Sequence, residues 1–188
     1  TDPKADEQLL ALIERMGGID TYFHVSGVGK NNLTLDPAIE LNTVRVNCEG
    51  FCRMVGCAFR YFRDNAVRGA QIAVVSSIAG TKGLGAAPAY SATKRMQNCY
   101  IQSLAQQCAI AKIDIPFTDI RPGFVATPLL DLDARRYPML MTTPYAARRI
   151  VRAIVARRRV AVIDWRYAIL TAAWRCIPRW LWERLPIK

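Results

Sequence analysis

Histidine is nearly missing from this sequence, since His24 is the only one in 188 residues. None of the six cysteines forms a C-x-x-C pair, the spacing typical of structural zinc sites and redox dithiols. We therefore predict no metal site. His24 has two interpretations, a contact to a ligand or a packed and hydrogen-bonded ring. No signal peptide is apparent, so we expect reduced cysteines and a cytoplasmic protein.

Long apolar runs are also lacking. The longest candidate, residues 167–174, is far shorter than the ~20 residues that a membrane-spanning helix needs. The composition, with 52% hydrophobic and 22% charged residues, is typical of a globular chain rather than a disordered one. The length of 188 residues suits one domain with a substantial core.

Acidic residues are scarce near the end of the chain. Residues 148–188 hold eleven Arg or Lys against two acids, a net +9, which leaves +2 of the total +11 for residues 1–147. All four tryptophans follow residue 163 and alternate with arginines, so we divide the chain into residues 1–163 and a basic tail, residues 164–188. Tryptophan beside arginine favours peripheral contact with a membrane surface. Packing of the tail on this chain or a second subunit is the equal alternative, and specific nucleic-acid binding is not expected.

Short apolar segments alternate with segments of helical periodicity. The predicted strands cover about 19–25, 71–76, 114–120 and 160–163, and the two long helices cover about 38–64 and 88–111. This alternation predicts an α/β fold whose parallel strands form one half of a doubly wound sheet. The first of these strands is expected to be an open edge.

One stretch combines a serine, a tyrosine and a lysine at chemically meaningful spacing. Ser77 ends a predicted strand, and Tyr90 and Lys94 lie four apart on the following helix, so they share a face. A nearby ammonium is expected to lower the tyrosine pKa from about 10 toward a value useful for proton transfer. An exposed Tyr/Lys pair is the alternative. The buried strand before the serine and the glycine-containing loop after it favour the functional interpretation.

This serine followed by Y-x-x-x-K resembles the signature of the short-chain dehydrogenases/reductases. The resemblance implies a Rossmann-type fold and hydride transfer between NAD(P)(H) and a carbonyl or alcohol substrate. Tyr90 would exchange the proton, Ser77 would orient the substrate oxygen, and Lys94 would lower the tyrosine pKa and hold the nicotinamide ribose. Asn47 would be the fourth member, although an ordinary helical asparagine is the alternative. Asn47 and Gly50 have low helix propensity, which indicates a local distortion of the helix there.

The resemblance also implies which residues meet the cofactor and the substrate. Residues 129–145, including Asp131 and Asp133, match the family's substrate lid. Their methionines and tyrosine suggest an apolar substrate such as a lipid, acyl or sterol-like ketone, as for a carbonyl reductase. The two long helices match the family's dimer surface, so a homo-oligomer is expected. The implied cofactor contacts are Gly27, Tyr90, Lys94, Pro122, Gly123, Val125 and Thr127.

A glycine-rich phosphate loop is absent from the sequence. Asn32 stands where a G-x-G-x-x-G motif starting at Gly27 would need its third glycine. In the resembled family a strand and a T-G-x-x-x-G-x-G turn bind the pyrophosphate, and Thr1 matches a point after the third strand. We therefore expect only the C-terminal two-thirds of the fold here, inactive alone. A non-catalytic binding or membrane-surface protein that cannot hold cofactor is the alternative function.

Overall fold

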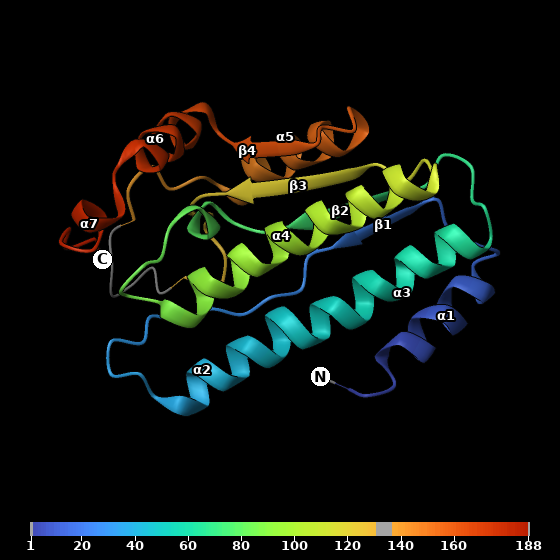
Figure 1. Cartoon of the computed structure of the whole chain (residues 1–188), viewed down its shortest axis with the longest axis horizontal. Coiled ribbons are helices and arrows are strands. Elements are labelled where there is room, and N and C mark those ends of the chain that lie inside the picture. Colours follow the sequence, from blue (N-terminus) through green and yellow to red (C-terminus); the bar gives the residue numbers. More distant parts are fainter. Residues whose placement is uncertain (1, 131–136, 188) are drawn as a thin grey trace.

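The computed structural model describes residues 2–130 and 137–187 of the chain. Four strands form one sheet, and helices cover both of its faces (Figure 1). In chain order the elements are α1 (Ala5–Arg15), β1 (Thr21–His24), α2 (Pro37–Val44), the π-helix η1 (Arg45–Gly50), α3 (Phe51–Asp64), β2 (Gln71–Val75), the 3₁₀ helix η2 (Ile78–Thr81), α4 (Pro88–Ala111), β3 (Phe117–Pro122), α5 (Thr143–Val155), β4 (Val160–Ile163), α6 (Trp165–Cys176) and α7 (Arg179–Trp182).

The sheet is parallel throughout, in the order β1-β2-β3-β4, which confirms the predicted α/β class and all four predicted strands. The third strand begins at Phe117 rather than at residue 114. The reason is that Lys112 takes a left-handed conformation with φ of 55° and Pro116 has no N–H to donate, so the chain enters the sheet only after Pro116. Among the described residues β1 has β2 as its only neighbour, and Phe23 and Val25 are exposed there, as expected for an open edge.

Two apolar cores lie on opposite faces of the sheet. Helices α3 and α4 cover one face and α5 covers the other, while α6 and α7 lie at the carboxyl ends of the strands (Figure 1). Ile72 and Val74 point into the first core and Ala73 into the second, because alternate strand residues face opposite sides. The first core includes Phe51, Phe59, Phe62, Ile101 and Phe117.

The helical stretch between residues 37 and 64 is distorted at its centre, as the sequence predicts. Residues 45–50 form a π-helix, which places Asn47 at full burial between α2 and α3. Such widened turns frequently mark functional sites, because they reorient one side chain without ending the helix.

The basic tail is attached to the rest of the protein through α6, through α7 and through Ile177 between them. Tyr167 on α6 is fully buried in the second core. Trp182 on α7 is 8% exposed, and its indole Nε1 donates to Gly83 O at 2.7 Å. Lys82 Nζ in turn donates to Ile177 O at 2.9 Å. Packing of the tail on its own chain therefore occurs, although the boundary between residues 163 and 164 as a domain division stays a prediction.

Candidate active site

The four residues predicted to be catalytic come from three elements that meet at the carboxyl end of β2. Asn47 lies in η1, Ser77 lies two residues after the end of β2, and Tyr90 and Lys94 lie in the first half of α4. The Ser77 hydroxyl caps η2 by accepting from the Ala79 N–H at 3.1 Å, which fixes the serine at the strand end. In open parallel sheets ligands bind at this end of the strands, so the arrangement suits a ligand site.

Ser77, Tyr90 and Lys94 are neighbours in space. The Ser77 hydroxyl lies near enough to the Tyr90 phenol to act on its pKa, which it lowers. Lys94 Nζ lies 5.8 Å from the centre of the Tyr90 ring, on its face. Pro122, at the end of β3, also reaches this group, because its carbonyl oxygen lies 3.5 Å from the Ser77 hydroxyl oxygen. These residues are separated in the sequence and lie together in one site.

The tyrosine pKa is shifted in the direction opposite to the prediction. Burial raises the pKa of Tyr90 above its ordinary value, and the Ser77 hydroxyl offsets only part of that rise. Loss of hydration disfavours the phenolate, and it is the largest cause of this shift. The expectation that the neighbouring Lys94 gives Tyr90 a lowered pKa was wrong, because burial raises that pKa.

Lys94 is buried and held by neutral acceptors. Its Nζ donates to Val75 O and to Gln97 Oε1, each at 3.1 Å, and the residue is 4% exposed. Burial lowers the pKa of Lys94 to about 8, while the negative charge of Asp119 acts in the opposite direction. The lysine can therefore change its charge near neutral pH.

A glutamine links the lysine to the π-helix. Gln97 is fully buried, accepts from Lys94 Nζ and donates through Nε2 to Asn47 O at 2.9 Å. One side-chain amide therefore joins the lysine to the backbone of the asparagine. Gln97 was missed in the sequence, although it lies seven residues after Tyr90 on the same helix face.

Asn47 fastens the loop that follows β1. Its Oδ1 accepts from Val28 N at 2.9 Å, and its Nδ2 donates to Val28 O at 2.7 Å and to Thr93 Oγ1 at 3.1 Å. The side-chain amide thus satisfies both backbone groups of one residue and ties them to α4. The interpretation of Asn47 as an ordinary helical residue is therefore the weaker one.

Two glycines let the loop after β1 lie against the catalytic candidates. A Cβ on Gly27 would lie 3.3 Å from both Asn47 Oδ1 and Lys94 Nζ. A Cβ on Gly29 would overlap the Tyr90 ring. Close approach of the backbone therefore explains the glycine at position 27, and the groups that it approaches are candidate catalytic side chains. Its contact with a cofactor stays a prediction.

His24 fits the packed alternative. It is 4% exposed, its Nδ1 lies 3.1 Å from the Tyr22 hydroxyl, and its ring meets Phe51 edge-on with centroids 5.2 Å apart. Burial lowers the pKa of His24 to about 4, so the ring is neutral at physiological pH. No group of three or more metal-ligating side chains occurs within residues 2–130 and 137–187.

The segment after β3 is built around a close backbone contact. A Cβ on Gly123 would overlap the ring of Tyr167, whose hydroxyl accepts from Phe124 N at 3.1 Å and donates to Pro138 O at 2.8 Å. Val125 then forms a parallel bridge with Met141. Thr127 is half-buried. The predicted cofactor contacts of Gly123, Val125 and Thr127 stay predictions.

The predicted lid lies partly outside the described residues, since Asp131, Asp133 and the two following arginines fall within 131–136. Of the part that is described, Tyr137 packs on Phe124 with ring centroids 4.9 Å apart. Met141 is 2% exposed and belongs to the second core. These contacts show packing within the chain, and the apolar wall facing a substrate stays a prediction.

The residues present fit the nicotinamide end of a dinucleotide cofactor. A charged lysine has three N–H donors, and Val75 and Gln97 account for two of those on Lys94. Tyr90 is only half-buried by its exposed fraction, so its edge is within reach of a ligand. The third N–H of Lys94 could thus bind a ribose hydroxyl, and the Tyr90 phenol could bind a substrate oxygen. The fit concerns this end only, because the sequence carries no glycine-rich turn for a pyrophosphate.

With this geometry, the chain is an α/β protein with a Ser–Tyr–Lys site at the carboxyl end of a parallel sheet. Residues 1–137 match the family model described as short chain dehydrogenase. The chain belongs to the short-chain dehydrogenase family, an oxidoreductase family, which confirms the resemblance inferred from the sequence.

Individual relatives are distant. An uncharacterized oxidoreductase of Myxococcus xanthus (strain DK1622) is 27% identical over 190 residues, covering 96% of this chain and 72% of the relative. The NADP-dependent (R)-specific alcohol dehydrogenase of Lentilactobacillus kefiri is 27% identical over 120 residues, covering 63% of this chain and 47% of the relative. This chain therefore corresponds to part of each.

Solved structures share the fold. A short chain dehydrogenase from Burkholderia cenocepacia J2315 in complex with NADP superposes with a TM-score of 0.82 at 17% identity, covering 100% of this chain and 77% of that one. Acetoin dehydrogenase from Salmonella typhimurium superposes with a TM-score of 0.73 at 19% identity, covering 90% of this chain and 72% of that one. These likenesses confirm the Rossmann-type architecture.

The buried lysine predicts a pH-dependent stability. The pKa of Lys94 is about 8 in the folded chain against 10.5 as its ordinary value, so between these pH values the unfolded chain binds more protons. The free energy of unfolding must then rise with pH through this window. Below pH 8 the lysine is charged in the folded chain, and burial of that charge destabilises the fold to its full extent. We expect this one group to contribute about 2–3 kcal/mol between pH 7 and 10.5.

The measurement is urea unfolding of wild type and Lys94→Met across that range, because the other titrating groups cancel in the difference. The free energy of unfolding of the wild type should increase relative to that of the variant as pH rises. The exposed Lys30→Met is the control and should run parallel to wild type. Parallel curves for Lys94→Met would show that the lysine does not titrate in this window.

Proposed function

We propose that these residues form the catalytic part of an NAD(P)(H)-dependent oxidoreductase acting on a carbonyl or alcohol. The observation that carries the proposal is the contact of Ser77, Tyr90 and Lys94 beside the end of β3. The bound nicotinamide would supply or accept the hydride. The protein's part is to hold the substrate oxygen, move one proton and exclude water.

Each side chain has a role that follows from its contacts. The Ser77 hydroxyl, fixed by Ala79 N–H, would donate to the substrate oxygen and orient it. The Tyr90 phenol would give its proton to that oxygen in reduction, and the raised pKa keeps it protonated and ready to donate. Lys94 would place its remaining N–H on a ribose hydroxyl and supply positive charge as the phenolate forms.

Asn47 and Gln97 would act as positioning residues. Asn47 holds the loop at Val28, and Gln97 holds the lysine against the π-helix. Because both amides are fully buried and paired, they can fix Lys94 without exchanging protons themselves. The apolar side chains near Phe124 and Met141 suggest an apolar substrate, and the expected homo-oligomer remains part of the proposal.

The direct test is turnover by a protein that carries a glycine-rich dinucleotide-binding segment upstream of Thr1. We expect oxidation of NADPH in the presence of apolar ketones, and no turnover by residues 1–188 alone. NADPH is the first cofactor to try, since two of the similar proteins are described with NADP. Cofactor binding without turnover on any carbonyl or alcohol would favour the non-catalytic alternative.

A second proposal concerns the tail, which could touch a membrane surface. Trp165 and Ile169 are 67% and 62% exposed on one face of α6, and Trp180 is 62% exposed on α7. Arg184 lies over the Trp180 ring at 5.7 Å from its centre, so a cation accompanies the exposed indole. No helix within residues 2–130 and 137–187 is long and apolar enough to cross a bilayer. Contact would therefore be peripheral.

The test uses substitution rather than deletion, because removing α6 would take Tyr167 out of the second core. Trp165→Gln with Trp180→Gln should reduce binding to phosphatidylglycerol vesicles about tenfold or more. The matched control replaces Ile110 and Val155, both 77% exposed on other helices, by Gln and should bind as wild type does. Vesicle binding that is undetectable, or equally reduced in both pairs, would end this proposal.

A further inference from the structure

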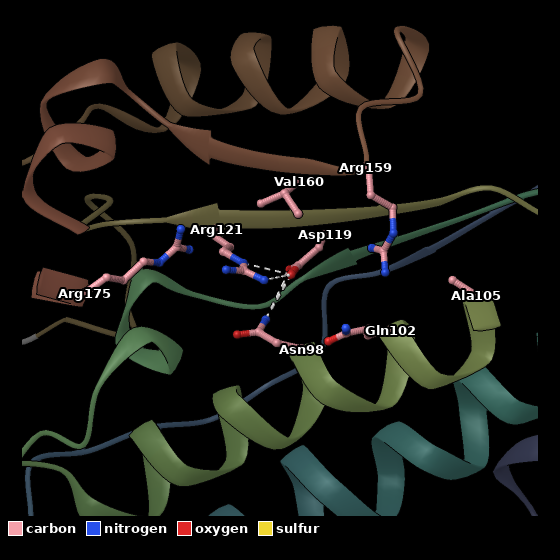
Figure 2. A pocket seen from close by; sticks show the side chains of 8 residues that line it. All are labelled: Asn98, Gln102, Ala105, Asp119, Arg121, Arg159, Val160 and Arg175. Atoms are coloured by element: carbon pink, nitrogen blue, oxygen red, sulfur yellow. Dashed lines mark hydrogen bonds and ion pairs between the residues drawn. The ribbon is translucent and has the colours of Figure 1, made fainter. Parts of the chain in front are cut away.

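A cavity of about 600 Å³ lies on the α4 side of the sheet, between α4, the strands β3 and β4, and the end of α6 (Figure 2). Its volume is in the range typical of small-molecule sites. It is separate from the group around Ser77 in that none of the four predicted catalytic residues lines it. The lining residues are Asn98, Gln102, Ala105, Asp119, Arg121, Arg159, Val160 and Arg175.

Arg121 is held firmly in this cavity by a buried carboxylate. Asp119 is 1% exposed, and its Oδ2 accepts from Arg121 Nε at 2.8 Å. Its Oδ1 accepts from the Ser76 hydroxyl at 2.5 Å, and both oxygens accept from Asn98 Nδ2. The carboxylate is therefore saturated by donors from three elements. Arg121 keeps further N–H groups for a ligand, because a guanidinium has five.

Arg159 and Arg175 bring two more guanidinium groups from different parts of the chain. Arg159 precedes β4 and Arg175 lies in the last turn of α6, and Figure 2 shows them extending into the space from two sides. Within the described residues neither forms an ion pair with an acid. Three arginines against the single carboxylate of Asp119 leave the cavity with a formal charge of +2.

The α4 side of the cavity is polar as well. Gln102 presents its amide toward the same space from α4, one turn after Asn98 (Figure 2). Like charges gathered around a partly enclosed space repel one another unless an anion lies between them. Arginine forks match the paired oxygens of phosphate groups, and such contacts are among the strongest hydrogen bonds in proteins.

We propose that this cavity binds a phosphomonoester, with Arg159 and Arg175 on the phosphate oxygens and Arg121 as a fixed third donor. The chemistry is the same for a soluble phosphorylated small molecule and for a phosphomonoester lipid headgroup. The proposal does not rest on the proposed oxidoreductase activity, because it concerns a different flank of α4.

The test is calorimetric titration of the 188-residue chain with inorganic phosphate, compared with chloride at equal ionic strength. We expect saturable binding of phosphate that weakens about tenfold or more in Arg159→Gln with Arg175→Gln. The matched control is Arg148→Gln with Arg152→Gln, two exposed arginines of α5 that lie outside the cavity. Equal weakening in both pairs, or no saturable binding, would overturn the proposal.

A second arm separates the two sources. Vesicles containing phosphatidic acid should retain wild type but not the Arg159/Arg175 variant if the ligand is a lipid headgroup, and vesicle binding should be the same in both if it is soluble. Thermal unfolding of each variant checks that the exposed substitutions leave the fold intact. If the double variant unfolds, the single variants Arg159→Gln and Arg175→Gln are titrated instead, each with a several-fold loss expected. Single variants that bind phosphate as tightly as wild type would equally overturn the proposal.

Discussion

Replacing Tyr90 by Phe is expected to abolish NAD(P)H-dependent reduction while leaving cofactor binding nearly unchanged. The substitution removes the phenol hydroxyl, which lies near Ser77 and could protonate a substrate oxygen. It keeps the ring that packs against Gly29 and lies beside Lys94, so the shape of the site is retained. Loss of a general acid costs about 100- to 10,000-fold in rate.

The measurement is kcat and the cofactor Kd in the protein carrying a dinucleotide-binding segment. Tyr100→Phe, on the same helix but packed against Phe51 in the first core, is the control and should keep full activity. A Tyr90→Phe protein with ordinary turnover would remove the tyrosine from the proposed chemistry. A variant that loses cofactor binding as well would instead assign it a structural role.

Replacing Gly123 by Ala should strongly destabilise the chain. The new Cβ would overlap the Tyr167 ring, which is fully buried and anchored by Phe124 N and Pro138 O. Because neither the ring nor the backbone can withdraw easily, we expect a loss of about 3 kcal/mol in the free energy of unfolding, at the upper end of overpacking costs. The second core and the end of β3 would be displaced together.

Gly85→Ala is the matched control, because a Cβ there meets nothing within 4 Å. Urea unfolding should place this control within a few tenths of a kcal/mol of wild type and Gly123→Ala well below it. Similar midpoints for the two variants would mean that Tyr167 can move aside, and that the glycine is needed for another reason.

Much of the fold could be predicted from local patterns. Largely apolar runs at residues 71–76 and 160–163 are typical of buried parallel strands, and the asparagine and glycine inside residues 38–64 indicated a distortion, which is a π-helix in the structure. The start of β3 was misplaced because Ile113 and Ile115 extend the apolar alternation, whereas the left-handed Lys112 and Pro116 decide where the strand begins.

The chemistry of the site was less predictable, since it depends on burial. The spacing of Tyr90 and Lys94 shows that they share a helix face, but it does not reveal how far each is removed from water. That removal raises the tyrosine pKa and lowers the lysine pKa. Gln97 and the arginine-lined cavity were missed because their partners lie on elements distant in sequence.

The central claim is that a nicotinamide delivers hydride to a carbonyl held by Ser77 and Tyr90. It is tested most directly with NADPH deuterated at the transferring carbon, an apolar ketone and the protein carrying a dinucleotide-binding segment. The account predicts an alcohol with one deuterium on the former carbonyl carbon, formed by wild type and not by Tyr90→Phe. Cofactor binding with no labelled alcohol from any ketone or aldehyde tried would contradict it.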